Sequence, residues 1–181
     1  MTVKETKLKG CFIIEPQVFK DKRGYFVESY NQVAFNKALG LDINFVQDNE
    51  SQSSKGVLRG LHYQLGEHAQ AKLVRVLKGK VLDVVVDVRP KSVTFGEHFC
   101  VELSEANKKQ LFVPKGFAHG FLVLQDHTIF SYKCDNFYNK ASEAGIIYND
   151  KDLDIDWQFA KEQLIISDKD LLLPSFKNAE L

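Results

Sequence analysis

The chain of 181 residues is 44% hydrophobic and 27% charged, an ordinary composition for a globular protein of one domain. Its 24 Lys and Arg residues balance 24 Asp and Glu residues, so it lacks the positive field of a dedicated nucleic-acid-binding protein. No apolar run approaches the roughly 18 residues of a membrane-spanning helix, and the first ten residues lack the apolar core of a secretory signal. We therefore expect a single cytoplasmic domain over residues 1–181, with no nucleic-acid or membrane partner.

The pattern along the chain is mainly that of β-strands. Short stretches rich in aliphatic and aromatic residues predict strands at 11–14, 24–30, 44–51, 57–64, 71–77, 80–88, 95–103, 110–113, 120–124 and 128–134. One helix is predicted at 32–39, with Asn31 as its N-cap and Gly40 just past its end, and a second, short helix near Ser167. Short strands with small connections indicate an all-β fold, a sandwich or closed barrel with a few short helices.

Two details of this pattern concern residues 71–88. Lys78 and Gly79 lie between two predicted strands and indicate a hairpin with a tight glycine turn. Aliphatic residues at every second position from 82 to 88 predict a stripe that faces the core. The intervening Asp83 and Asp87 are then expected to face outward, toward solvent.

Several common functional signatures are absent. The chain has no P-loop, Rossmann glycine motif, HExxH, GxSxG or EF-hand loop, which argues against P-loop hydrolysis, nicotinamide chemistry and serine hydrolysis. Its three widely spaced cysteines, Cys11, Cys100 and Cys134, argue against a disulfide framework or a CxxC metal site. Buried free thiols in a reducing cytoplasm are the simplest interpretation.

An Arg and a His interrupt the apolar strand predicted at 57–64. On a straight strand Arg59 and His62 would point to opposite faces, because side chains alternate. Gly60 between them can host a bulge that turns one of them to the other face. Taken alone, His62 fits a hydrogen-bonded core or surface histidine better than a functional one.

Residues 113–121 read VPKGFAHGF and contain PxGxxH, which is similar to the second conserved box of cupins. The first cupin box supplies HxH followed shortly by Glu, whereas the matching positions here give His62, Tyr63 and Gln64, with His68 further on. Two separated histidines without a third ligand make a poor metal site. The sequence therefore predicts a cupin-like barrel without a metal.

Lys72 and Tyr132 lie on predicted strands with apolar neighbours on the same face. Lys72 is either an edge lysine that prevents aggregation, which the residues alone favour, or a buried cation with a partner. Tyr132 is expected to point inward, as a core tyrosine or as a catalytic one. With His62, these side chains suit proton abstraction beside a carbonyl, which needs a base, a cation for the enolate and an acid. Base and acid on opposite faces of the carbon would invert the stereocentre.

The chain closely resembles the dTDP-4-dehydrorhamnose 3,5-epimerase family from about residue 14 to residue 174. Each shared motif is weak alone, and their occurrence in order is specific. They lie at 21–28 (DKRGYFVE), 45–49 (FVQDN), 56–64 (GVLRGLHYQ), 71–76 (AKLVRV), 113–121 (VPKGFAHGF), 132–134 (YKC) and 164–170 (LIISDKD). The resemblance implies a cupin-type jelly-roll barrel (a double-stranded β-helix), a homodimer, and no metal or other cofactor.

The same resemblance implies four catalytic residues. His62 would be the general base and Asp170 would orient its imidazole. Tyr132 would be the acid on the opposite face, and Lys72 would stabilise the enolate at the C4 ketone. Because Arg59 would also contact substrate, the resemblance turns the conflict with His62 into a prediction of a bulge or strong twist near Gly60.

The implied substrate contacts are spread over most of the chain. Arg23 and Arg59 match the pyrophosphate contacts of the family, where a planar charged fork suits phosphate oxygens. Tyr138 matches the ring that stacks on thymine, and Glu28 the residue at the base edge. The other implied binding residues are Phe26, the sugar-binding loop Gln47, Asp48 and Asn49, His119 close to the sugar, and Glu143 and Lys169.

The implied function is an isomerase that acts on a dTDP-linked 4-keto-6-deoxy sugar. It would convert dTDP-4-dehydro-6-deoxy-D-glucose to dTDP-4-dehydro-L-rhamnose by epimerisation at C3 and C5 through an enolate. The first alternative is a single-carbon (C3 or C5) epimerase for a related nucleotide-linked 4-keto sugar. Alternatives from other classes are a non-catalytic cupin that binds a sugar or nucleotide, and a metal-dependent cupin oxygenase.

Overall fold

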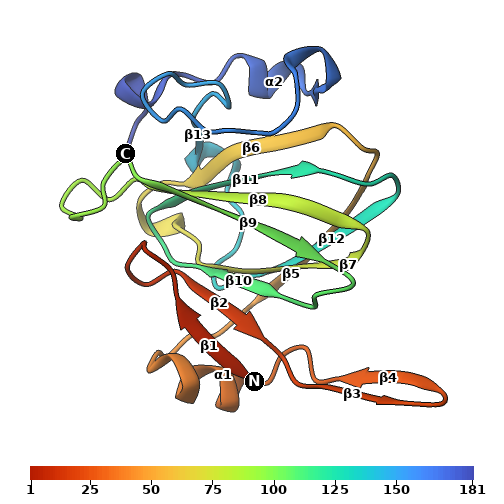
Figure 1. Ribbon diagram of the computed structural model, residues 1–181. Coiled ribbons are helices and arrows are strands. Elements are labelled where there is room, and N and C mark those ends of the chain that lie inside the picture. The colour runs from red at the N-terminus through yellow and green to blue at the C-terminus, as the bar shows by residue number, and fades with distance from the viewer.

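Two facing β-sheets make up most of the computed structural model, which describes residues 1–181 (Figure 1). In order across the first sheet are β1 (Thr2–Glu5), β2 (Phe12–Glu15), β10 (Gln110–Val113), β7 (Lys72–Lys78), β12 (Thr128–Cys134) and β5 (Gln47–Ser53). Across the second are β13 (Glu143–Gly145), β6 (Val57–Gln64), β11 (Phe117–Val123), β8 (Lys80–Asp87) and β9 (His98–Ser104), with β14 (Ile165–Ile166) beside β6. The prediction of an all-β fold is confirmed.

The remaining elements lie outside the two sheets. Strands β3 (Val18–Asp21) and β4 (Gly24–Val27) form a separate hairpin that extends away from the body (Figure 1). Helix α1 (Gln32–Leu39) begins at Asn31, whose side chain accepts a hydrogen bond from the backbone N–H of Ala34, and ends at Gly40 in the left-handed conformation, as predicted. Helix α2 (Asp168–Leu171) begins after Ser167, and 3-10 turns occupy 66–68, 140–142, 161–163 and 176–178. No helix is long and apolar enough to cross a membrane.

The predicted hairpin at Lys78 and Gly79 is wrong. Strands β7 and β8 flank Gly79, but β7 pairs with β10 and β12 in the first sheet, whereas β8 pairs with β11 and β9 in the second. Gly79 therefore carries the chain from one sheet to the other, with a φ of +78° that favours glycine. Each strand turns one face toward the core between the sheets, so each shows the alternation of apolar residues that two paired strands would also show.

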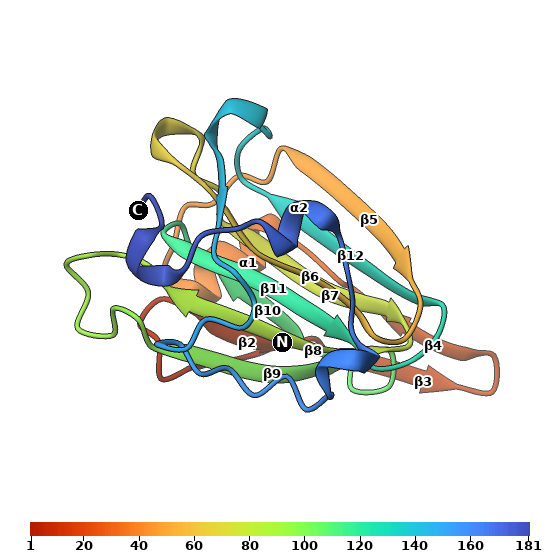
Figure 2. The same cartoon turned by 90° about the horizontal axis from the view of Figure 1, so that it is seen from above.

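The main core lies between the sheets. Its fully buried members include Val74 from β7, Val85 from β8, Leu111 from β10 and Phe130 from β12. A second apolar cluster lies on the far face of the second sheet, where the C-terminal segment with Tyr148, Leu153 and Trp157 covers it. Figure 2 shows this segment, with α2, crossing over β6 and β11.

Strand β8 is consequently buried on both faces. The predicted stripe at 82–88 is buried, but it packs under the C-terminal segment and not between the sheets. The opposite face of β8, with Val81 and Val85, points into the core between the sheets. Asp83 and Asp87 share that face and are 0% exposed, so the expectation that they face solvent is wrong.

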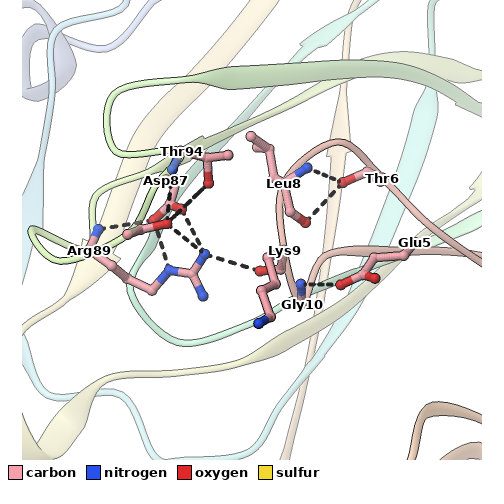
Figure 3. A network of polar contacts seen from close by, with 9 residues as sticks. Glu5, Thr6, Leu8, Lys9, Gly10, Asp87, Arg89 and Thr94 are labelled. Carbon is pink, nitrogen blue, oxygen red and sulfur yellow. Dashed lines mark hydrogen bonds and ion pairs between the residues drawn. The ribbon is translucent and has the colours of Figure 1, made fainter.

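Asp87 anchors the loop after β8 (Figure 3). It accepts hydrogen bonds from Arg89 Nε at 2.8 Å and Nη2 at 2.6 Å, Ser92 Oγ at 2.5 Å and Thr94 Oγ1 at 2.6 Å. Burial alone would raise the pKa of Asp87, but these hydrogen bonds outweigh it and lower the pKa to about 2. Arg89 also donates to the carbonyl of Lys9, so the network ties the loop to the N-terminal segment.

The three cysteines are free thiols, as predicted. Cys11 and Cys134 are buried, and Cys100 is half-buried.

Candidate active site

A cavity of about 640 Å³ lies between the two sheets at the end covered by α2. The first sheet contributes residues from β5, β7 and β12, and the second contributes β6, β11 and β14. A second cavity of about 240 Å³ adjoins it and shares Asn49, His62, Lys72 and Tyr132. The predicted residues that line one or both are His62, Tyr132, Asp170, Lys72, Arg59, His119, Asn49, Lys169, Gln47, Tyr138 and Glu143.

A bulge in β6 brings Arg59 and His62 to the same cavity, as predicted. His62 lies opposite His119 on β11, and Arg59 lies opposite Phe121. Three steps along β6 therefore match two steps along β11, and the extra residue reverses the alternation. Gly60 in this bulge has φ +119°, and a Cβ there would lie 2.6 Å from Gly120 Cα.

His62 and Asp170 form a hydrogen-bonded pair at the cavity. His62 Nε2 lies 2.7 Å from Asp170 Oδ1, and Asp170 Oδ2 accepts the backbone N–H of Gly60 at 3.1 Å. Ser167 caps α2 by accepting the Asp170 N–H at 3.2 Å, which fixes where the carboxylate lies. Burial alone would raise the pKa of Asp170. The interaction with His62 and the hydrogen bonds from Gly60 and Ser167 outweigh this effect and lower the pKa below its usual value, so the carboxyl is ionised. His62 has 31% of its side chain exposed, against 5% for Asp170, so the histidine is the member that reaches a ligand.

Tyr132 faces the same cavity from the opposite sheet. Its ring packs on the core beside Phe130, with centroids 6.1 Å apart, so the prediction of an inward-facing ring is confirmed. Burial raises the pKa of the Tyr132 hydroxyl, which therefore carries its proton at neutral pH. A protonated hydroxyl at the cavity can act as a proton donor.

Lys72 lines the same cavity as His62 and Tyr132. Strand β7 has neighbours on both sides, so the edge-lysine interpretation is wrong. Lys72 Nζ is 5.9 Å from the centroid of the Tyr132 ring and has no ion-pair or hydrogen-bond partner. Desolvation lowers the pKa of Lys72, while the nearby Cys134, Asp83 and Glu143 oppose that shift.

His119 and Asp83 form a second, deeper histidine–carboxylate pair. His119 Nε2 lies 3.1 Å and 3.0 Å from the two carboxylate oxygens of Asp83. Burial raises the pKa of Asp83, and His119 and Lys72 oppose that increase. Sequence reasoning missed Asp83, although its strand face also carries Val81 and Val85, which was a signal of burial.

Glu143 joins three elements at the mouth of the cavity. Its Oε2 accepts a hydrogen bond from Tyr138 Oη at 2.8 Å and lies 2.6 Å from Lys169 Nζ. The backbone N–H of Tyr138 donates to Gln47 Oε1 at 3.1 Å. The Tyr138 ring is 53% exposed and is free to stack on a planar group.

Four predicted binding residues lie outside these cavities. Asp48 points to the other face of β5, where it pairs with Lys133 Nζ at 2.8 Å, because strand side chains alternate. Arg23 lies at the tip of the β3–β4 hairpin with 84% of its side chain exposed, and it pairs with Asp21. Phe26 is 67% exposed and, with Glu28, lines a separate cavity of about 320 Å³ beside α1.

The arrangement suits proton transfer on a bound carbonyl compound. A histidine with a carboxylate partner and a protonated tyrosine face one cavity from opposite sheets, and a lysine lies in its wall. Such a set can remove a proton from one side of a carbon, stabilise the enolate and return a proton to the other side. No group of three or more His, Cys, Asp or Glu side chains is arranged to hold a metal ion.

Comparisons with known proteins agree on one family. The model of the family described as dTDP-4-dehydrorhamnose 3,5-epimerase matches residues 5–178. The Escherichia coli (strain K12) dTDP-4-dehydrorhamnose 3,5-epimerase is 55% identical over 170 residues, which cover 94% of this chain and 91% of that protein. The crystal structure of the Elizabethkingia anophelis enzyme of that name has a TM-score of 0.95 and 57% identity, covering 98% of this chain and 97% of the other. A Legionella pneumophila epimerase in complex with dTDP-4-keto-L-rhamnose has a TM-score of 0.94 and 46% identity, covering 98% and 93%.

Proposed function

The chain belongs to the dTDP-4-dehydrorhamnose 3,5-epimerase family, and we propose that His62, Tyr132, Lys72 and Asp170 carry out the reaction of that family. The protein is an isomerase that epimerises dTDP-4-dehydro-6-deoxy-D-glucose at C3 and C5 to dTDP-4-dehydro-L-rhamnose. The observation that supports these roles best is the approach of His62 and Tyr132 to one cavity from opposite sheets.

Each epimerisation is a proton exchange beside the C4 ketone. His62 removes the proton from C3 or C5, the C–H electron pair forms the enolate double bond, and the negative charge moves to the C4 oxygen. Lys72 stabilises that oxygen. Asp170 holds the His62 ring and stabilises its imidazolium at a hydrogen-bond distance of 2.7 Å. Tyr132 donates a proton to the opposite face of the carbon, which inverts the centre.

The two cavities divide the substrate between them. Arg59, in the larger cavity, is placed to bind the pyrophosphate with its guanidinium fork. Asn49 and His119 contact the sugar, with Gln47 close by. The exposed ring of Tyr138 stacks on thymine, held by Glu143, which Lys169 neutralises in turn.

A second copy of the chain completes the site. Arg23, Phe26 and Glu28 lie on or next to an exposed hairpin and do not line the cavity of their own chain. In a homodimer, the β3–β4 hairpin of each subunit would bring Arg23 and Phe26 to the nucleotide end of its partner's cavity. The rings of Phe26 and Phe19, 6.4 Å apart on the hairpin, would be covered by the same contact.

A mixing experiment tests this dimer. His62→Ala and Arg23→Ala proteins are each impaired, but a heterodimer of the two contains one site with both His62 and Arg23 intact. Random exchange of subunits should restore about a quarter of the wild-type activity. If a mixture shown to contain heterodimers recovers no activity, each chain uses its own hairpin.

The fold and setting complete the proposal. We assign the two sheets to a cupin-type jelly-roll barrel, formed as one domain by residues 1–181. The free cysteines fit a protein of the reducing cytoplasm.

Substitution of the proposed base tests the site assignment directly. His62→Ala should abolish turnover of dTDP-4-dehydro-6-deoxy-D-glucose without loss of the fold. His127→Ala, which removes an exposed histidine in the turn before β12, is the matched control and should retain full activity. Wild-type turnover by the His62→Ala protein would overturn the assignment.

A further inference from the structure

Asp83 is a fully buried carboxylate that is hydrogen-bonded to His119, a residue lining the active-site cavity. It is 0% exposed, on the face of β8 that points between the sheets with Val81 and Val85. Its only hydrogen-bond partner is His119 Nε2, which both of its oxygens approach at 3.0–3.1 Å. A buried carboxylate with one partner costs free energy that an apolar side chain at this position would not. The stability of the core therefore does not explain why a carboxylate occupies position 83.

The pair with Asp83 determines how His119 faces the cavity. An ionised carboxylate only accepts hydrogen bonds, so beside an ionised Asp83 the proton of His119 lies on Nε2. The ring is 7% exposed and packs on Phe130 at a centroid distance of 6.1 Å and an interplanar angle of 23°. With Nε2 committed to Asp83 and one ring face on Phe130, Nδ1 is the nitrogen left for a ligand.

Asp83 is also one of the groups that favour the charged form of Lys72. The lysine faces the cavity from β7 without an ion pair, and burial disfavours its charged form. Besides Asp83 on β8, the titratable groups that line the two cavities with Lys72 are Glu50 on β5, Arg59, His62 and Tyr63 on β6, His119 on β11, Tyr132 and Cys134 on β12, Tyr138 in the following loop, Glu143 on β13, and Lys169 and Asp170 on α2. Of all these groups, Cys134, Asp83 and Glu143 favour the charged form of Lys72. Glu143 already pairs with Lys169, and Cys134 is a buried thiol whose pKa is raised to about 11, so it is neutral. Asp83 is the remaining one of the three groups that favour the charged form of Lys72.

We propose that Asp83 is a positioning residue of the epimerase reaction, which fixes the His119 ring through Nε2 and supplies the buried negative charge that keeps Lys72 cationic beside the C4 oxygen. The inference rests on the proposed function, because it assigns Lys72 to the enolate oxygen. It adds a buried residue that acts through His119 and Lys72 and does not itself touch the sugar.

Asp83→Asn tests the proposal, because asparagine keeps the size of the side chain and removes its charge. Asp87→Asn is the matched control, since Asp87 is equally buried on the same face of the same strand but pairs with Arg89, away from the cavity. We expect kcat of Asp83→Asn to fall roughly 10- to 100-fold, the range found when a carboxylate that orients a metal-binding histidine is removed, with KM little changed. Asp87→Asn should retain the kcat of the wild type at temperatures where it is folded.

The pH profile separates positioning from a structural role. Without Asp83, Lys72 loses its proton at lower pH, so the alkaline limb of kcat should move down by about one pH unit. Only Asp83→Asn should show this shift. An alkaline limb at the same pH in Asp83→Asn and Asp87→Asn would overturn the proposal, whatever the loss in kcat.

A measurement on the unmodified enzyme covers the case in which Asp83→Asn does not fold. Nitrogen-15 NMR of the histidine rings should show His119 protonated on Nε2, with its resonance assigned through His119→Gln. Protonation on Nδ1 alone would overturn the proposal. The wild-type assay run in parallel keeps the two claims distinguishable: no turnover by the wild type would refute the proposed function, whereas the tautomer of His119 does not depend on it.

Discussion

Asp170→Asn tests the role of the carboxylate beside the proposed base. During proton abstraction His62 becomes an imidazolium, and its positive charge faces Asp170 across a hydrogen bond of 2.7 Å. Two unit charges about 4 Å apart interact by about 4 kcal/mol at an effective dielectric constant of 20. Because 31% of the His62 side chain is exposed, solvent screens part of this energy, and we take about 2–4 kcal/mol. That range corresponds to a fall in kcat of roughly 30- to 1000-fold.

Asparagine also changes the hydrogen bond. Its oxygen can still accept the Gly60 N–H, which directs its amide N–H₂ toward His62 Nε2 and favours the wrong tautomer. Product formation followed by proton NMR gives kcat, and urea unfolding checks that the variant is folded. Asp168→Asn makes the same charge change at an exposed position of α2 and should leave kcat unchanged. If folded Asp170→Asn keeps a kcat within three-fold of the wild type, Asp170 does not stabilise the charged base.

Three further predictions concern the acid, the loop anchor and the bulge. Tyr132→Phe should lower product formation by roughly 10²- to 10⁴-fold while deuterium from D₂O still enters the substrate; full epimerisation would remove Tyr132 from the mechanism. Asp87→Asn should lose about 2 kcal/mol of stability at pH 7, since the pKa of Asp87 is lowered from 3.8 to about 2. Its folded pKa is depressed, so the difference from wild type in urea unfolding should hold above about pH 4 and disappear toward pH 2; a difference that persists at pH 2 would contradict this reasoning. Gly60→Ala should inactivate the enzyme, because its Cβ would lie 2.6 Å from Gly120 Cα, whereas Gly66→Ala, also at positive φ but with open space around it, should keep its activity.

Local patterns in the sequence predicted local structure well. The ranges predicted for β6, β10 and β12 match the structure, and so do both caps of α1. The bulge at Gly60 was predicted only with the help of the family resemblance, which requires Arg59 and His62 to reach one cavity. The strand ranges and the helix caps depend on residues within one strand or one helix.

Features that depend on distant segments were not predictable in this way. Alternation shows that a strand has a buried face, but not which sheet it joins, so the corner at Gly79 was taken for a hairpin. Asp83 was assigned to solvent because the stripe at 82–88 was taken as the only buried face of β8, although Val81 and Val85 beside Asp83 indicated a second one. Short strands such as β13 and β14 have too few residues to show a period. The hairpin with Arg23 and Phe26 needs a second chain to show its role.

Proton NMR of dTDP-4-dehydro-6-deoxy-D-glucose in D₂O with the wild-type protein tests the central claim most directly. A 3,5-epimerase should introduce deuterium at both C3 and C5 as the product forms, and His62→Ala should introduce none. Exchange at C3 alone, or at C5 alone, would make the protein a single-carbon epimerase. The absence of exchange at both carbons, despite binding of dTDP, would contradict the account and leave a nucleotide-binding protein with the fold of an epimerase.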